Sequence, residues 1–289
     1  MTVRLRDVLV KSFAELRYEP AQRRVRATLD GMTVVDSDRA MLVWEPRHVV
    51  PYFAVPAEDV HATVVPASTP ATGDSAVVTL APEGAAAGGV SIVPPGSFRT
   101  HSCAGEELSI RSSAGEPGWT RDRAAFRFME PVLAGYLGLD FSAFDAWFEE
   151  EDRILAHPRD PFHRVDVRRS ARHVRIELEG RLLAESRQAR LLFETHLPLR
   201  FYLPAADVDH RLLEASARRT TCAYKGHAEY CSVRLADRVV EDLAWSYRQP
   251  LPEAAGIAGM IAFFDERVDV FLDGQLRPRP STPWSRRAA

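Results

Sequence analysis

The sequence predicts a mainly β, α+β protein made of two homologous small antiparallel β domains, each with a short helix. Val25 to Val60, "VRATLDGMTVVDSDRAMLVWEPRHVVPYFAVPAEDV", matches Val174 to Val208, "VRIELEGRLLAESRQARLLFETHLPLRFYLPAADV", with a single-residue gap. Both copies alternate apolar and polar residues with the period of two that is typical of half-buried strands. The length of 289 residues suits two domains of ordinary size.

Each copy is expected to open with a meander of strands. The first strand is "VRATL" or "VRIEL", and the return strand contains "TVVDS" or "LLAES". Asp30-Gly31 and Glu179-Gly180 join them, because glycine tolerates the positive φ of a tight hairpin turn. "AMLVWE" or "ARLLFE" forms a third strand, and "YFAVP" or "FYLP" a short fourth strand that ends at proline.

The later parts of the two copies correspond more loosely. Residues 131–145 resemble 252–270, where small and apolar residues at helical spacing predict a short helix that leads to a strand. The first copy also carries "ASTPATGDSAVVTLAPEGAAAGGVSIVPPGS", an insertion whose Ala, Gly and Pro content predicts loops and weak edge strands. We therefore expect a degenerate N-terminal copy over 1–146, a packed connector over 147–172 and a complete copy over 173–289.

Composition excludes several classes of function. The net charge is −3 and acidic and basic residues are interspersed, so nucleic acid and anionic membranes are not expected partners. The N-terminus lacks the apolar run of a signal peptide, which predicts a cytoplasmic protein. Three cysteines without framework spacing predict reduced thiols. Because two copies in one chain imitate a dimer, we expect a monomer.

Five stretches of the chain carry a resemblance to a known family: "VWE", "FETHLPLRFYLPAADV", "TTCAYKGHAEYCSV", "EDLAWSY" and "IAGMIAFF". They resemble the family catalogued as domain of unknown function 427, also labelled nucleotidyltransferase-like. The chain looks like a tandem, two-copy member. The resemblance implies a small, mostly β fold with a short helix in each copy, and it brings no proven reaction. The family commonly has Pro where this chain has Ala223, within Cys222 to Gly226.

Glu194 and Lys225 are the first candidate catalytic residues. Glu194 ends an apolar strand, and its counterpart in the first copy is Glu45. It either caps loop amides or acts as an acid–base group whose pKa is raised by apolar neighbours such as Phe193. Lysine occurs only at Lys11 and Lys225, and the resemblance also implies a lysine at the second position. Lys225 would pair with Glu194, bind a substrate anion or act as a base.

Two further candidates precede that lysine in the same turn. Cys222 is either a small buried hydrophobe or a nucleophile, since a thiol near Lys225 and His227 would hold more thiolate. Tyr224 would donate a hydrogen bond. Cys222, His227 and Cys231 with a carboxylate would make a zinc ligand set, but the paired short spacing of structural zinc sites does not occur, so no metal is expected.

Aromatic residues provide candidate substrate contacts. Trp245 and Tyr247 alternate in "LAWSY" and share one face of a strand. The resemblance places them and Tyr230 on the aromatic positions of the family. With His227 they would line a pocket with convergent polar groups, although most large rings belong to cores. The connector "HPRDPFHRVDV", with its histidines and arginines, either forms turns or lines a cleft between the domains.

These observations lead to one functional hypothesis and two rivals. The hypothesis is a metal-independent small-molecule enzyme without a cofactor, which uses acid–base or thiol chemistry in a pocket of the C-terminal copy. The first rival is a non-catalytic module that binds a small molecule or peptide. The second is a nucleotidyltransferase-like activity, which the family label alone suggests: no phosphate-binding glycine loop such as GxxxxGK[ST] occurs.

Overall fold

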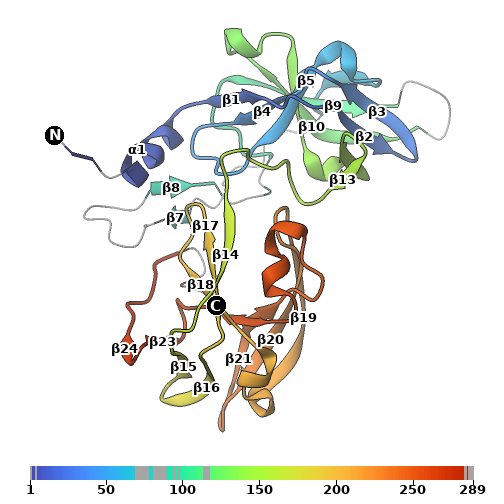
Figure 1. Cartoon of the computed structure of the whole chain (residues 1–289). Coiled ribbons are helices and arrows are strands. Elements are labelled where there is room, and N and C mark those ends of the chain that lie inside the picture. Colours follow the sequence, from blue (N-terminus) through green and yellow to red (C-terminus); the bar gives the residue numbers. More distant parts are fainter. Residues whose placement is uncertain are drawn as a thin grey trace. The chain divides into compact units, whose positions relative to one another are not determined.

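The computed structural model describes residues 2–3, 5–68, 78–80, 90–93, 96, 98–112, 118–282 and 285. The chain divides into two compact units, Met1–Val78 with Ser91–Asp160 and Thr79–Val90 with Pro161–Ala289. Both units consist mainly of antiparallel strands, which confirms the predicted fold class (Figure 1). The expected connector contributes strands to both units, because its first part lies in the first unit and its last part in the second.

The first unit contains a seven-stranded and a four-stranded sheet. In the order β1-β4-β5-β11-β10-β9-β6, the strands of the larger sheet are β1 (Arg17–Pro20), β4 (Met41–Trp44), β5 (Tyr52–Pro56), β11 (Tyr136–Leu139), β10 (Thr120–Phe128), β9 (Gly105–Arg111) and β6 (Thr63–Pro66). The smaller sheet has the order β13-β12-β2-β3, with β13 (Asp152–Ile154), β12 (Ala146–Glu149), β2 (Val25–Leu29) and β3 (Met32–Ser37).

The second unit repeats this arrangement. Its larger sheet has the order β14-β17-β18-β22-β21-β20-β19, with β14 (Val165–Arg169), β17 (Arg190–Glu194), β18 (Arg200–Leu203), β22 (Ile261–Phe263), β21 (Val239–Ser246), β20 (Gly226–Arg234) and β19 (Leu213–Cys222). Its smaller sheet has the order β16-β15-β23-β24, with β16 (Arg181–Ser186), β15 (Val174–Leu178), β23 (Asp269–Leu272) and β24 (Gln275–Leu276). The first copy, degenerate in sequence after Val60, therefore retains every strand of the second.

The tight turns form for the reason that the sequence suggests. Asp30 and Gly31 have φ of 50° and 76°, and Glu179 and Gly180 have φ of 52° and 77°. Positive φ at both central residues is the requirement of the hairpin turn that matches the twist of its strands. In β2 and β15, alternate side chains are fully buried. The first meander of each copy is thus fixed locally by its sequence.

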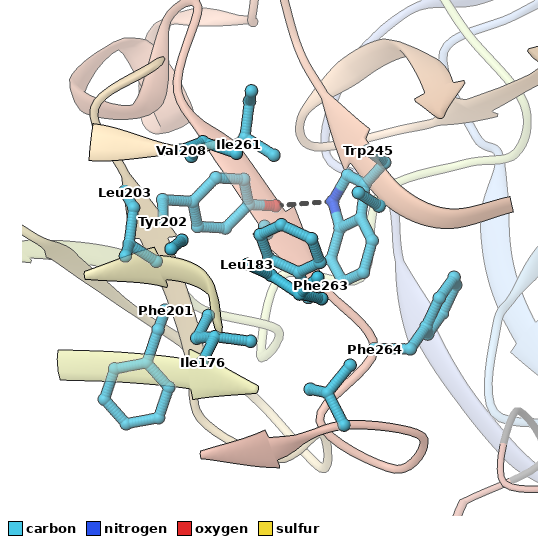
Figure 2. Close-up of a cluster of buried hydrophobic side chains, with 14 of the residues drawn as sticks. Ile176, Leu183, Phe201, Tyr202, Leu203, Val208, Trp245, Ile261, Phe263 and Phe264 are labelled. Carbon is cyan, nitrogen blue, oxygen red and sulfur yellow. Dashed lines mark hydrogen bonds between the residues drawn. The ribbon is translucent and has the colours of Figure 1, made fainter. Parts of the chain in front are cut away.

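Each unit has its own apolar core. In the second unit the core includes Phe201, Tyr202 and Phe263, and the indole nitrogen of Trp245 donates a hydrogen bond of 2.9 Å to the Tyr202 hydroxyl (Figure 2). This bond satisfies two polar groups that are buried among apolar side chains. The core thereby fixes β18 and β21, which pair with β17 and β20.

The helical segments are short. Pro131–Leu133 and Pro252–Ile257, which lie where the sequence predicts helices, are 3₁₀ helices. Within the described residues the only α-helix is α1 (Leu5–Lys11). In the insertion, Val78–Leu80 (β7) and Val90–Ile92 (β8) pair as a two-stranded sheet, and most of its remaining residues, including the glycine-rich run, lie outside the described residues. No helix among the described residues has the length and apolar character needed to span a membrane.

Candidate functional site

The candidate site begins at Glu194, the last residue of β17. Its β14 partner is Val165, so the residues just before β14 lie beside the carboxylate. The amide of Arg164 donates to the Thr195 hydroxyl at 2.8 Å, and the Thr195 amide donates to the Arg164 carbonyl at 3.0 Å. These bonds fix the chain on both sides of Glu194, whose side chain is only 6% exposed.

Lys225 reaches Glu194 from the turn between β19 and β20. Cys222 pairs with Gly226 at the end of the hairpin, and Gly226 has a φ of 90°, a backbone conformation that glycine adopts readily. The ammonium of Lys225 donates a hydrogen bond to Glu194 Oε2, and its side chain is 9% exposed. The two residues that the sequence singled out, some thirty positions apart, therefore form a buried ion pair.

His163 completes the group. Its Nε2 lies 3.3 Å from Glu194 Oε1, and its ring stacks on that of Tyr224 with centroids 4.3 Å apart. The His163 side chain is 16% exposed, more than either member of the ion pair. Sequence reasoning placed His163 in the connector and missed this role. The available signal was its position two residues before a strand, but the pairing of that strand with β17 is a long-range contact.

Glu194 stays ionised in this environment. Burial favours the neutral acid, but the charge of Lys225 and the hydrogen bonds from His163 and Lys225 outweigh it and hold the pKa of Glu194 to about 2. The raised pKa that the acid–base interpretation of Glu194 required, one of its two alternatives, is therefore wrong. Phe193, the neighbour proposed to raise it, is 37% exposed.

Lys225 is a fixed cation for a related reason. Burial disfavours its charge, but the adjacent Glu194 outweighs this effect and raises the pKa of Lys225. The amine thus holds its proton near neutral pH and does not act there as a base. Its counter-ion role, one of the three options for this residue, agrees with this geometry.

Cys222 and Tyr224 adjoin the ion pair. The Tyr224 amide donates to Cys222 Sγ at 3.5 Å, and Cys222 is close enough to Lys225 to affect its titration. Tyr224 and Ala223 are both buried. Four predicted residues, Glu194, Cys222, Tyr224 and Lys225, therefore meet at one place.

The aromatic candidates differ in their positions. Tyr247 is buried, and burial together with the nearby Tyr202, Cys222 and Glu194 raises the pKa of its hydroxyl. Trp245 belongs to the core and binds Tyr202 (Figure 2). The Tyr230 hydroxyl instead shares a 3.0 Å hydrogen bond with Thr220. Tyr202, which sequence reasoning did not select, contributes a second phenol near Glu194.

His227 does not join the buried group. It is exposed on β20, and its Nδ1 shares a hydrogen bond of 3.0 Å with Thr221 Oγ1. Cys231 is half-buried, and burial raises the pKa of its thiol. Over the part of the chain that the structure describes, no three His, Cys, Asp or Glu side chains assemble in a way that would hold a metal ion.

The first copy buries its equivalent acid with different partners. Glu45 is fully buried and accepts hydrogen bonds from the Tyr52 hydroxyl and His101 Nδ1, both at 2.7 Å. The amides of Ser102 and Cys103 also donate to it. Although burial favours the neutral acid, these donors hold the pKa of Glu45 to about 2. This acid organises the loop that contains residues 101–103.

The strand register shows what replaces the lysine. Ala125 of β10 pairs with Leu108, as Ala244 of β21 pairs with Cys231. Ser102 precedes Leu108 by as many residues as Lys225 precedes Cys231, so Ser102 occupies the position of Lys225. The first copy thus keeps the buried acid but has a serine where the second copy has the amine.

The other connector residues divide between the units. His157 Nδ1 lies 2.7 Å from the Pro158 carbonyl, a local turn contact in the first unit. Arg159 and Asp160 also belong to the first unit, and Arg164 belongs to the second with His163. A cleft between the domains stays a prediction.

Comparison with known proteins identifies the family. The model of the family described as Domain of unknown function (DUF427) matches residues 17–74 and 166–274, two segments that together cover more than half of the chain. One segment falls in each copy of the fold. No curated protein matches the chain.

Proposed function

The chain belongs to the DUF427 family as a two-copy member, and from that premise we propose that its second copy is a metal-independent acid–base enzyme that acts on a small molecule. The carrying observation is that Glu194 binds both Lys225 and His163 in a largely closed site. An ionised carboxylate that orients an imidazole is a common arrangement for a general base.

The charges divide the roles. Glu194 is held as an anion and Lys225 as a cation, so neither exchanges a proton readily near neutral pH. His163 is the remaining basic group of the cluster. With Nε2 directed to Glu194, its Nδ1 is the atom that would take a proton from a substrate. Glu194 and Lys225 then act as positioning residues that fix the ring.

The surroundings indicate how a substrate would be bound. Tyr224 stacks on the imidazole and would limit its rotation. The Tyr247 hydroxyl is a buried donor near Glu194, and Cys222 supplies a thiol beside the amine. A small molecule with a polar group for these donors and an apolar body for the rings of Tyr224 and Tyr247 would fit such a site.

A matched set of variants tests this proposal. The purified protein is incubated with a metabolite extract, and consumed and formed compounds are identified by mass spectrometry. We expect turnover by the wild type and by His227→Gln, whose histidine is exposed, and at least a hundredfold loss in His163→Gln. Equal turnover by His163→Gln and the wild type would refute the role of this histidine.

The same experiment addresses a binding module, the second candidate. Glu194 and Lys225 are almost fully buried and neutralise each other's charge. Because neither then exchanges a proton readily, the pair favours a site that binds a molecule without converting it. An unchanged compound that copurifies with the wild type, is lost in Glu194→Gln and is never converted would establish binding in place of catalysis.

A further inference from the structure

Asp265 lies under a segment that follows β24. Its side chain is 8% exposed, and it lines a cavity of about 10 Å³, close to the space of one water molecule. Pro198, Leu199 and Val270 form part of the cavity wall. Arg277, Pro278 and Pro280 form the rest. We call residues 277–282 the strap.

One carboxylate oxygen of Asp265 is unsatisfied. Among the described residues, Oδ1 has no hydrogen-bond partner. Arg200 Nη1 is 3.8 Å from Oδ1, too far for a hydrogen bond. Arg200 is instead bound through both nitrogens to Glu266, at 2.7 and 2.6 Å. A charged carboxylate in this position is costly, because Oδ1 is buried without a hydrogen-bond donor from the described residues.

Several contacts hold the strap in place. The Arg277 amide donates to the Val270 carbonyl at 2.8 Å, and the Thr282 hydroxyl donates to Glu266 Oε1 at 2.6 Å. Arg279 pairs at the surface with Asp269 at 2.8 Å. The strap itself lies outside the named strands, so it can open without unfolding of the sheets.

We propose that the strap is a pH-dependent cover, which closes over the neutral Asp265 side chain and opens when that side chain ionises. The charged groups that face Asp265 are Arg200 from β18, Glu266 beside it and Arg277 from the strap itself. The remaining wall is formed by proline, leucine and valine side chains, which provide no compensating charge.

The titration of Asp265 supports this geometry. Burial raises its pKa from 3.8 to about 7, since it outweighs the attraction of Arg200, while Glu266 adds repulsion. A raised pKa means that the closed state binds the proton more tightly than the open state. Closure is therefore fully favoured below about pH 4 and is lost as the pH rises to about 7. The equilibrium constant for opening of the strap should increase up to ~10-fold per pH unit, or ~10³-fold over the whole window.

Opening would change more than the cavity. Release of Thr282 removes a partner of Glu266, which holds Arg200. The Arg200 guanidinium lies 5.7 Å from the ring of Trp245, the residue that binds Tyr202. The cover thus connects to the strands of the candidate site, but its opening can be measured without any catalytic activity.

Hydrogen exchange of the full chain tests the proposal. Peptides that cover residues 277–282 are followed between pH 4.5 and 7.5, with correction for the intrinsic exchange rate. In the wild type we expect protection to fall by at least a hundredfold. Asp265→Asn should remove the pH dependence, whereas Asp269→Asn, which loses only the surface pair with Arg279, should keep it.

Two results would overturn the cover. One is wild-type protection that does not change with pH, and the other is an equal pH dependence in Asp265→Asn. If that variant does not fold, Arg277→Gln is informative: loss of the positive charge that faces Asp265 should move the midpoint to higher pH. A midpoint that stays the same or falls contradicts the proposal.

Discussion

Replacing Lys225 with methionine tests the electrostatics of the buried ion pair. The pKa of Glu194 falls from 4.5 to about 2 in the folded chain, and one pKa unit corresponds to 1.36 kcal/mol, so the site favours the carboxylate by about 3 kcal/mol. Without Lys225, the buried carboxylate loses its main partner. We expect Lys225→Met to lower the free energy of unfolding at pH 7 by about 3–5 kcal/mol.

The pH dependence gives a second measure of the same variant. In the wild type, the stability from Glu194 is present above about pH 4.5 and is lost as the pH falls toward 2. In Lys225→Met, burial dominates and raises the folded pKa of Glu194, so acidification through that pKa should stabilise the variant. The double variant Lys225→Met with Glu194→Gln should recover much of the loss, because no buried charge remains.

Urea denaturation combined with hydrogen exchange distinguishes the two units. Peptides from β17 and β20 report the second unit, and peptides from β4 and β9 report the first as an internal control. The reasoning fails if Lys225→Met costs less than about 1 kcal/mol at pH 7, since an ion pair worth so little behaves like a solvent-exposed one. It also fails if the pH dependence of β17 is unchanged.

Three further predictions concern other buried groups. Trp245→Phe leaves the Tyr202 hydroxyl without its donor and should cost about 1–3 kcal/mol in thermal denaturation, whereas adding Tyr202→Phe should cost little more. Burial and Glu45 raise the pKa of the Cys103 thiol from 9.0 to about 12. At pH 8, iodoacetamide should therefore label Cys103 ~10³-fold more slowly in the folded than in the urea-unfolded chain. Comparable labelling rates would be evidence against this burial. Glu45→Gln should lower the free energy of unfolding of the first unit by about 3 kcal/mol at pH 7. The wild type should lose stability in this unit between pH 4.5 and 2 and the variant should not, as measured by hydrogen exchange of β4 peptides over this pH range.

Local patterns predicted the strands well. The period of two in "VRIEL" and the Glu179-Gly180 turn determine β15 and β16 without information from elsewhere in the chain. The helices at the ends of the copies were predicted less well, because Pro252–Ile257 has the apolar spacing of an α-helix but forms a 3₁₀ helix. Such short segments are governed by the strands that they join.

The site was predicted in part. Composition and resemblance identified Lys225 and Glu194, and the fold brings them together. The sign of the Glu194 pKa shift was wrong, because it depends on which of two opposing effects is larger, and only the geometry of Lys225 and His163 decides this. His163 and Asp265 were missed, since His163 meets Glu194 and Asp265 lies near Arg200, and both of these partners are distant in the chain.

The edge of the larger sheet is where the two copies have diverged most. In the second copy a three-residue turn joins β19 to β20 and carries the amine. In the first copy the equivalent edge strands, β6 and β9, are joined by a long excursion that supplies peptide amides and an imidazole to the acid. An outer hairpin tolerates such exchange because few other strands depend on it. The partners of the buried acid are therefore set by one replaceable loop, and the frame of strands beneath it occurs twice while those partners differ.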